Sequence, residues 1–183
     1  MQLTGIPGFD AAVMEFVQNH LHNAVTDTVF PFLTRLGEAG AVWLILAAVL
    51  LCFKKTRTTG ILVLISMALT FVTGELGLKN LICRLRPCHT FPEVPLLIPC
   101  PDSFSFPSGH SASSFAATVM LFLRHKKQAW PALILAALIA FSRVFLFVHW
   151  PTDILAGTLL GTLFALTVYS IYSRRIFQKR AKG

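Results

Sequence analysis

Four long apolar segments constrain the fold of this chain more than any other feature. They cover Ala39–Phe53, Thr59–Leu78, Trp130–Val148 and Ile154–Tyr172. A transmembrane helix needs about 20 apolar residues, within a range of about 17–25. Only 13% of the residues are charged, against about 25% in soluble domains. We therefore predict an all-α, polytopic integral membrane helix bundle that forms a single domain over residues 1–183.

Two further segments raise the predicted number of spans to five or six. Ser108–Leu123 is rich in Ser, Ala and Thr, and such small residues suit a helix that packs inside a bundle instead of facing lipid. Residues 1–37 are predicted to form an amphipathic helix at the membrane surface and a short apolar piece, Val25–Leu36. The apolar residues of the amphipathic helix are Phe9, Val13, Phe16, Val17 and Leu21. The sequence leaves open whether Val25–Leu36 crosses the membrane.

The basic residues predict the orientation of the bundle. They gather in the turns Lys54–Arg57 and Arg124–Lys127 and in the tail at 174–183, which all fall on one side of the predicted spans. Clusters of Lys and Arg mark the cytoplasmic side of a membrane protein. The proline-rich loop at 79–107 and the start of the Ser108 helix are then extracytoplasmic. Because the net charge of +8 is concentrated in these turns, we expect a membrane and not a nucleic acid as the partner.

Three polar motifs lie at the outer ends of the apolar segments. They are Lys79-x6-Arg86-Pro87, Pro107-Ser108-Gly109-His110 and Ser142-Arg143-x5-His149-x3-Asp153. Ser108 is a good N-cap, and Gly109 lets an anion approach the free backbone N–H groups of the helix start. Lys79, Arg86 and Arg143 add fixed positive charges that suit a phosphate. His149 and Asp153 are four residues apart, so the carboxylate can orient the imidazole within one helical turn.

The three motifs resemble the signature of the type 2 phosphatidic acid phosphatase superfamily, the lipid phosphate phosphatases related to vanadium haloperoxidases. Every position of that signature is matched, in order, between Lys79 and Asp153. The resemblance implies that His149 is the nucleophile and forms a phosphohistidine, and that His110 is the general acid. It also implies no metal and no cofactor. The residues that the resemblance assigns to phosphate binding are Lys79, Arg86, Ser108, Gly109 and Arg143.

The substrate is less well defined than the chemistry. The compact chain resembles bacterial members of this family, which include undecaprenyl diphosphate phosphatases and phosphatidylglycerophosphate phosphatases. The predicted extracytoplasmic site favours undecaprenyl diphosphate in the plasma or inner membrane, with phosphatidylglycerophosphate and phosphatidic acid as alternatives. Two other classes of protein remain open: a non-catalytic lipid-binding membrane protein and a vanadate-dependent haloperoxidase. The sequence does not indicate an oligomeric state.

Several residues near the motifs receive a separate interpretation. Among the three cysteines of the outer loop, Cys88 and Cys100 are the pair whose disulfide would staple the proline-rich segment in an oxidising compartment. Arg84 lies outside the family pattern, and we expect it either to contact a lipid headgroup or to be a solvated loop residue. His89 and His125 are expected to have no catalytic role.

Overall fold

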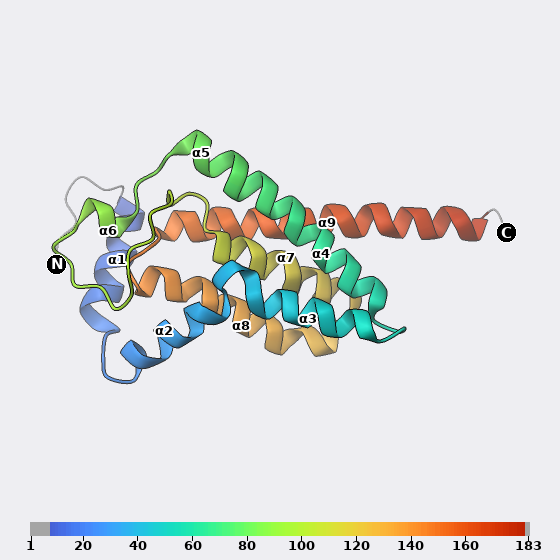
Figure 1. The fold of residues 1–183 in the computed structure, drawn as a ribbon, viewed down its shortest axis with the longest axis horizontal. Helices are drawn as coiled ribbons and strands as arrows, with labels where there is room; N and C mark the ends of the chain where they lie inside the picture. Colours follow the sequence, from blue (N-terminus) through green and yellow to red (C-terminus); the bar gives the residue numbers. More distant parts are fainter. Residues whose placement is uncertain (1–7, 182–183) are drawn as a thin grey trace.

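The computed structural model describes residues 8–181, and every regular element in that range is a helix (Figure 1). The α-helices are α1 (Gly8–His20), α2 (Thr26–Leu36), α3 (Ala41–Cys52), α4 (Arg57–Phe71), α5 (Lys79–Ile82), α6 (Pro87–Thr90), α7 (Gly109–Arg124), α8 (Lys126–Phe145) and α9 (Pro151–Ala181). A 3₁₀ turn at Glu38–Gly40 precedes α3, and a π-helical turn at Val72–Leu78 joins α4 to α5. The all-α prediction is confirmed for the described chain. The first seven residues of the predicted N-terminal segment lie outside it.

Helix α7 is the central helix of the bundle and packs against α4, α8 and α9 (Figure 1). Its buried side chains are mostly small: Ser111, Ala112, Ser114, Ala116, Ala117, Thr118, Met120 and Leu121. Two glycines of α9 let the helices approach closely, because a Cβ on Gly161 would collide with the carbonyl oxygen of Ala112 and one on Gly157 with that of Ser108. The prediction that this poorly apolar helix packs inside the bundle is confirmed.

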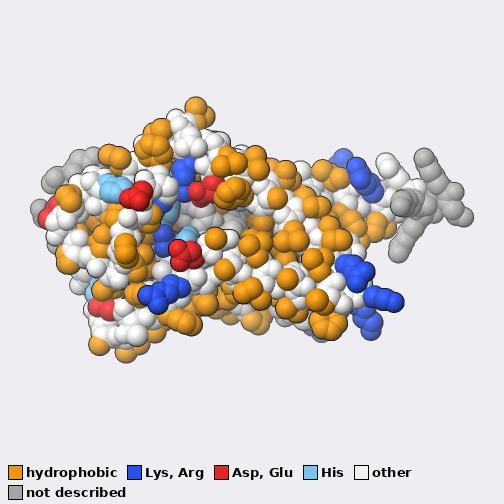
Figure 2. All heavy atoms as spheres, in the orientation of Figure 1, with side chains coloured by type: hydrophobic (Ala, Val, Ile, Leu, Met, Phe, Trp, Pro, Cys, Tyr) orange, Lys and Arg blue, Asp and Glu red, His pale blue; other side chains and the backbone are white. Residues whose placement is uncertain are grey.

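Larger apolar side chains fill the space around α7. Trp43 of α3 is fully buried, and its Nε1 donates a hydrogen bond to Ser114 Oγ at 2.8 Å. A second apolar cluster, which includes Phe145 and Phe147, lies where α1 packs against α8. Figure 2 shows apolar side chains over the middle of the molecule and Lys and Arg side chains near its C-terminal end. This distribution is typical of a bundle surrounded by lipid, with basic residues at one membrane surface.

Between residues 8 and 181, three helical stretches are long and apolar enough to cross a membrane: Arg57–Thr90, Lys126–Phe145 and Pro151–Gln178. The helix α2 and the stretch Glu38–Cys52 meet this criterion together, as a pair bent by 47°. Alone, the 12 residues of α3 extend about 18 Å, which is short of the ~30 Å hydrocarbon core. The predicted span at Ala39–Phe53 is therefore too short by itself, and the count of five or six spans stays a prediction.

The N-terminal helix α1 is present, but one of its faces covers protein. Met14 and Val17 are buried, whereas Phe9 and Phe16 are each 55% exposed. Their exposed rings suit a membrane surface, although the location of α1 there stays a prediction.

The boundaries of two predicted segments shift. The outer loop begins at Cys83 instead of Lys79, because α4 continues through the π-helical turn into α5. At the other end, α9 continues through most of the predicted basic tail to Ala181. Lys79 is consequently held on a helix, which fixes its position more firmly than a loop would.

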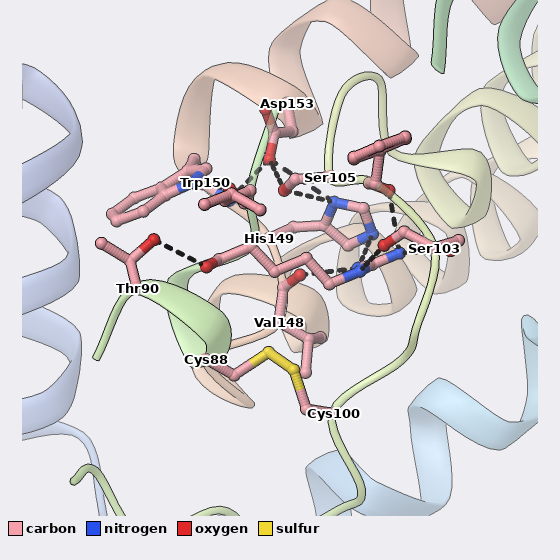
Figure 3. The surroundings of a disulfide bond; sticks show 12 residues. Cys88, Thr90, Cys100, Ser103, Ser105, Val148, His149, Trp150 and Asp153 are labelled. Carbon is pink, nitrogen blue, oxygen red and sulfur yellow. Dashed lines mark hydrogen bonds and ion pairs between the residues drawn. A yellow bond between two sulfur atoms is a disulfide. The ribbon is translucent and has the colours of Figure 1, made fainter. Parts of the chain in front are cut away.

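The sequence left open whether Cys88 and Cys100 form a disulfide, and the structure contains this bond, with 6.1 Å between the two Cα atoms (Figure 3). It ties the short helix α6 to the segment that precedes α7. Within the described chain, Cys52 and Cys83 are free and exposed.

Candidate active site

A cavity of about 1030 Å³ opens at the end of the bundle where α7 begins, away from the basic C-terminal end of α9 (Figure 2). Figure 2 shows basic, acidic and His side chains gathered around this hollowed part of the surface. The cavity brings together six of the eight predicted site residues: Lys79, Arg86, Gly109, His110, Arg143 and His149. All three motifs are represented, although their residues come from three separate helices, the loop before α6 and the turn between α8 and α9. Asp153 and Ser108 lie behind this wall and are fully buried.

His149 sits in the turn between α8 and α9 and is 2% exposed. Its Nε2 lies 2.9 Å from Nη1 of Arg86. Because a guanidinium can only donate, Nε2 must accept, so the ring hydrogen is on Nδ1, which lies 3.5 Å from Oδ2 of Asp153. Burial, together with the positive charges of Arg86, Arg143 and Lys79, lowers the pKa of His149 well below its usual range. The imidazole is therefore neutral at pH 7 and keeps a lone pair on Nε2.

The carboxylate of Asp153 is held in one orientation by donors on both oxygens, and Figure 3 shows those from Ser105 and Trp150. Its Oδ2 accepts hydrogen bonds from the backbone N–H of Trp150 at 2.9 Å and from the hydroxyl of Ser105. Its Oδ1 accepts from Nη1 of Arg84 at 2.7 Å. These contacts aim Oδ2 at Nδ1 of His149, which fixes the tautomer that leaves Nε2 free of hydrogen.

The two motif arginines are used differently. Every side-chain nitrogen of Arg86 donates to a protein acceptor, including the carbonyl oxygens of Ser103 at 2.6 Å and Val148 at 2.7 Å. Arg143 donates from Nη1 to Thr34 Oγ1 at 2.5 Å, while its buried Nε has no hydrogen-bond partner within the described chain. Arg86 thus contributes mainly charge and positioning, whereas Arg143 keeps a free buried donor that a phosphoryl oxygen can satisfy.

Lys79 shares the cavity with an acidic residue outside the predicted set. Its Nζ lies 2.8 Å and 2.7 Å from the two carboxylate oxygens of Glu75, on the π-helical turn. A Cβ on Gly109 would collide with Oε1 of Glu75, so the missing side chain leaves room for this carboxylate at the start of α7. The i, i+4 spacing of Glu75 and Lys79 is a signal that sequence reasoning could have used.

The start of α7 is capped as predicted, but the side chain of Ser108 does not line the cavity. Its Oγ accepts hydrogen bonds from the backbone N–H of Ser111 at 3.4 Å and from the Ser111 hydroxyl at 3.0 Å. His110 does line the cavity and packs against Gly37, where a Cβ would come within 2.8 Å of its Cδ2. The cap therefore fixes the helix start that presents His110.

The interpretation of Arg84 as a headgroup contact or a solvated residue is wrong. Its guanidinium bridges the carboxylates of Asp153 and Asp10, the latter from α1. Neither Asp10 nor Ser105 had any signal in the sequence, because both reach the site only through tertiary packing. His89 and His125 do not line the cavity, as expected.

Comparison with known proteins places this geometry in a family. The model of the PAP2 superfamily matches residues 59–177, which include all three motifs. The chain belongs to the PAP2 superfamily. The membership predicted from the motifs is thereby confirmed.

This PAP2 superfamily member is 36% identical over 156 residues to an undecaprenyl-diphosphatase of Sulfolobus acidocaldarius, a match that covers 85% of this chain and 74% of the relative. Its fold is similar to that of Aquifex aeolicus LpxE, with a TM-score of 0.78, 24% identity, and coverage of 93% of this chain and 99% of that one. It is also similar to a PAP2-type phosphatidylglycerolphosphate phosphatase of Bacillus subtilis, with a TM-score of 0.72, 28% identity, and coverage of 90% and 85%.

Proposed function

We propose that this protein is a membrane lipid phosphatase that removes the terminal phosphate of a polyprenyl diphosphate, with undecaprenyl diphosphate as the preferred substrate. One observation carries the proposal: the neutral, buried His149 lies on a cavity wall together with Lys79, Arg86 and Arg143. Three cations around a neutral imidazole suit an anionic substrate that the imidazole attacks. Simple lipid binding would need the cations but not the oriented His149–Asp153 pair.

In the first step, Nε2 of His149 forms a bond to phosphorus as the bond from phosphorus to the leaving oxygen breaks. His110 gives its proton to that oxygen, and Asp153 stabilises the Nδ1–H of the phosphohistidine. In the free enzyme, Nη1 of Arg86 donates a hydrogen bond to Nε2. Once Nε2 is bonded to phosphorus it can no longer accept, so Nη1 donates its hydrogen bond to a phosphoryl oxygen instead. Arg86 is thus placed to stabilise the negative charge that develops on the phosphoryl oxygens in the transition state.

In the second step, His110 accepts a proton from a water molecule, whose oxygen attacks phosphorus. The bond between phosphorus and Nε2 breaks, and inorganic phosphate leaves with His149 regenerated. Positive charge for both steps comes from Lys79, Arg86 and Arg143, so we propose that no metal ion or other cofactor takes part.

The shape of the cavity supports a lipid substrate. Away from the polar cluster, it is lined by Leu44 of α3 and by Leu64, Met67 and Phe71 of α4. Leu44 and Phe71 are 43% and 55% exposed on the outside of the bundle. An apolar tail can therefore extend from the phosphate into the surrounding lipid between α3 and α4. The similarity to an undecaprenyl-diphosphatase favours a polyprenyl tail, and the Bacillus structure keeps phosphatidylglycerophosphate as the alternative.

The proposed activity can be measured as phosphate release by the purified protein in detergent micelles that contain EDTA. The substrates are undecaprenyl diphosphate, phosphatidylglycerophosphate and phosphatidic acid, each at the same mole fraction. We expect release in EDTA, with undecaprenyl diphosphate hydrolysed fastest. Activity that appears only after a divalent metal is added would contradict the metal-free mechanism, and preference for a glycerophospholipid would contradict the substrate assignment.

We also propose that the active face is extracytoplasmic in the plasma or inner membrane. The Cys88–Cys100 disulfide supports this orientation, since disulfides persist in oxidising compartments. The two free cysteines provide a matched test, because Cys83 follows the outer helix α5 and Cys52 ends α3 near the basic turn. An impermeant maleimide applied to intact cells should label Cys83 and leave Cys52 unlabelled. Labelling of Cys52 instead of Cys83 would contradict the proposed orientation and indicate the opposite one.

A further inference from the structure

Arg84 connects the proposed catalytic carboxylate to the N-terminal helix. Its Nη1 lies 2.7 Å from Oδ1 of Asp153, and its Nη2 lies 2.6 Å from Oδ2 of Asp10. Asp10 comes from α1 and is 1% exposed, although it is an isolated acidic residue in the sequence. A charged side chain that is this deeply buried needs partners that compensate its desolvation.

Thr152 completes a closed set of hydrogen bonds around Asp10. The backbone N–H of Thr152 donates to Oδ1 of Asp10 at 2.9 Å, and its hydroxyl donates to Oδ2 at 2.7 Å. The same hydroxyl accepts from Nη1 of Arg84 at 2.7 Å. Since Thr152 lies in the first turn of α9, Asp10 also satisfies an N–H that the helix itself leaves unpaired. The guanidinium of Arg84 further lies 5.3 Å from the ring centre of Trp150.

These contacts hold the guanidinium of Arg84 between the carboxylates of Asp10 and Asp153. Oδ2 of Asp153 is fixed by Ser105 and by the backbone of Trp150, and Oδ1 is fixed by Arg84. Without Asp10, the guanidinium would lose the contact that opposes Asp153, and Oδ1 would lose its fixed donor. The carboxylate could then rotate away from His149.

We propose that Asp10 is a positioning residue, which acts through Arg84 on the orientation of Asp153 and thereby on His149. This inference rests on the function proposed above. The N-terminal helix is then part of the catalytic apparatus as well as a cover on α8 and α9. Displacement of a reacting group by about 1 Å can lower a rate by about 10²-fold, even when the change is remote.

The test is a double-mutant cycle on phosphate release from undecaprenyl diphosphate with Asp10→Asn and Asp153→Asn. Asp10→Asn keeps the size of the side chain, and we expect kcat to fall about 10–100-fold with KM changed less than about twofold, because no residue of the cycle holds the phosphate. In the Asp153→Asn background, the same change should have little further effect, since the group it positions is already impaired. Asp27→Asn, which removes an N-terminal carboxylate paired with His22 at 2.8 Å, is the matched control and should keep wild-type kcat.

Each outcome decides a different point. Equal losses from Asp10→Asn in both backgrounds would indicate a purely structural role and overturn the inference, as would unchanged kcat in the single variant. If Asp153→Asn itself leaves kcat unchanged, the proposed role of Asp153 fails and this inference fails with it, whereas only an absence of phosphate release by the wild type would contradict the proposed function. Thermal unfolding of all variants in the same detergent separates a loss of fold from a loss of positioning. A variant that loses kcat but unfolds at the wild-type midpoint temperature supports the positioning role. A loss of kcat that occurs only together with a lowered midpoint temperature opposes it.

Discussion

Replacement of His149 by Gln is expected to lower the rate of phosphate release by at least about 10³-fold, because the reaction loses its nucleophile. Gln has similar size and can still hydrogen-bond, so Arg86 and Asp153 keep a partner. Its amide nitrogen has no lone pair available to attack phosphorus. Initial rates with the purified protein in micelles, at saturating lipid, measure the effect on kcat directly.

A second histidine provides the control for this substitution. His125, at the start of α8, lies 2.9 Å from Thr59 Oγ1 and away from the cavity. His125→Gln should therefore keep phosphate release within about twofold of the wild type, as most substitutions far from a site do. A His149→Gln variant that retains activity comparable to this control would exclude His149 as the nucleophile.

Replacement of His110 by Asn should produce a loss that depends on the leaving group. General acid catalysis contributes about 10²–10⁴-fold, and it matters most when the leaving oxygen is strongly basic. Hydrolysis of phosphatidic acid expels the basic alkoxide of diacylglycerol, so its rate should fall by about that factor. With p-nitrophenyl phosphate, whose leaving group needs no proton, formation of the phosphoenzyme should be much less affected.

The same variant should change the second step, because His110 also activates the attacking water. With p-nitrophenyl phosphate, His110→Asn is expected to release a burst of p-nitrophenol equal to the enzyme concentration, followed by slow turnover. Rapid-mixing absorbance measurements can resolve this burst. An equal loss on both substrates without a burst would mean that His110 binds the substrate but does not transfer protons.

The fold class could be predicted from the sequence because it depends mainly on local features of the chain. Apolar length and basic turns identify helices that cross a membrane without reference to any contact. The small residues of α7 likewise predicted an internal helix, which the close approach of Gly161 to Ala112 explains. The span predicted at Ala39–Phe53 was misjudged, since this stretch meets the length criterion only together with α2, across a bend of 47°.

The motifs predicted which residues meet, but not how each is used. Arg86 and Arg143 looked equivalent in the sequence, yet the carbonyl oxygens of Ser103 and Val148 occupy the donors of Arg86 alone. Ser108 was expected to bind phosphate, whereas its hydroxyl is directed into the helix cap. Such differences depend on backbone groups, whose position no residue type reveals.

The hydrogen-bond network that joins Asp10, Arg84 and Asp153 could not be predicted from the sequence for a further reason. Asp10 and Asp153 are separated by most of the chain and meet only when α1 packs beside the start of α9. Arg84 joins them because the loop after α5 turns back toward the bundle. No spacing rule connects residues in three such segments, so only the folded chain places them together.

The most direct test of the proposed function is to trap the phosphoryl group on the enzyme. The protein is mixed in EDTA with undecaprenyl diphosphate labelled with ³²P in its terminal phosphate, quenched in base within milliseconds, and digested to locate the label. The proposal predicts transient label on the peptide that contains His149, followed by release of labelled inorganic phosphate, with neither seen in His149→Gln. Release of labelled phosphate without label on His149, or from the variant at the wild-type rate, would contradict it.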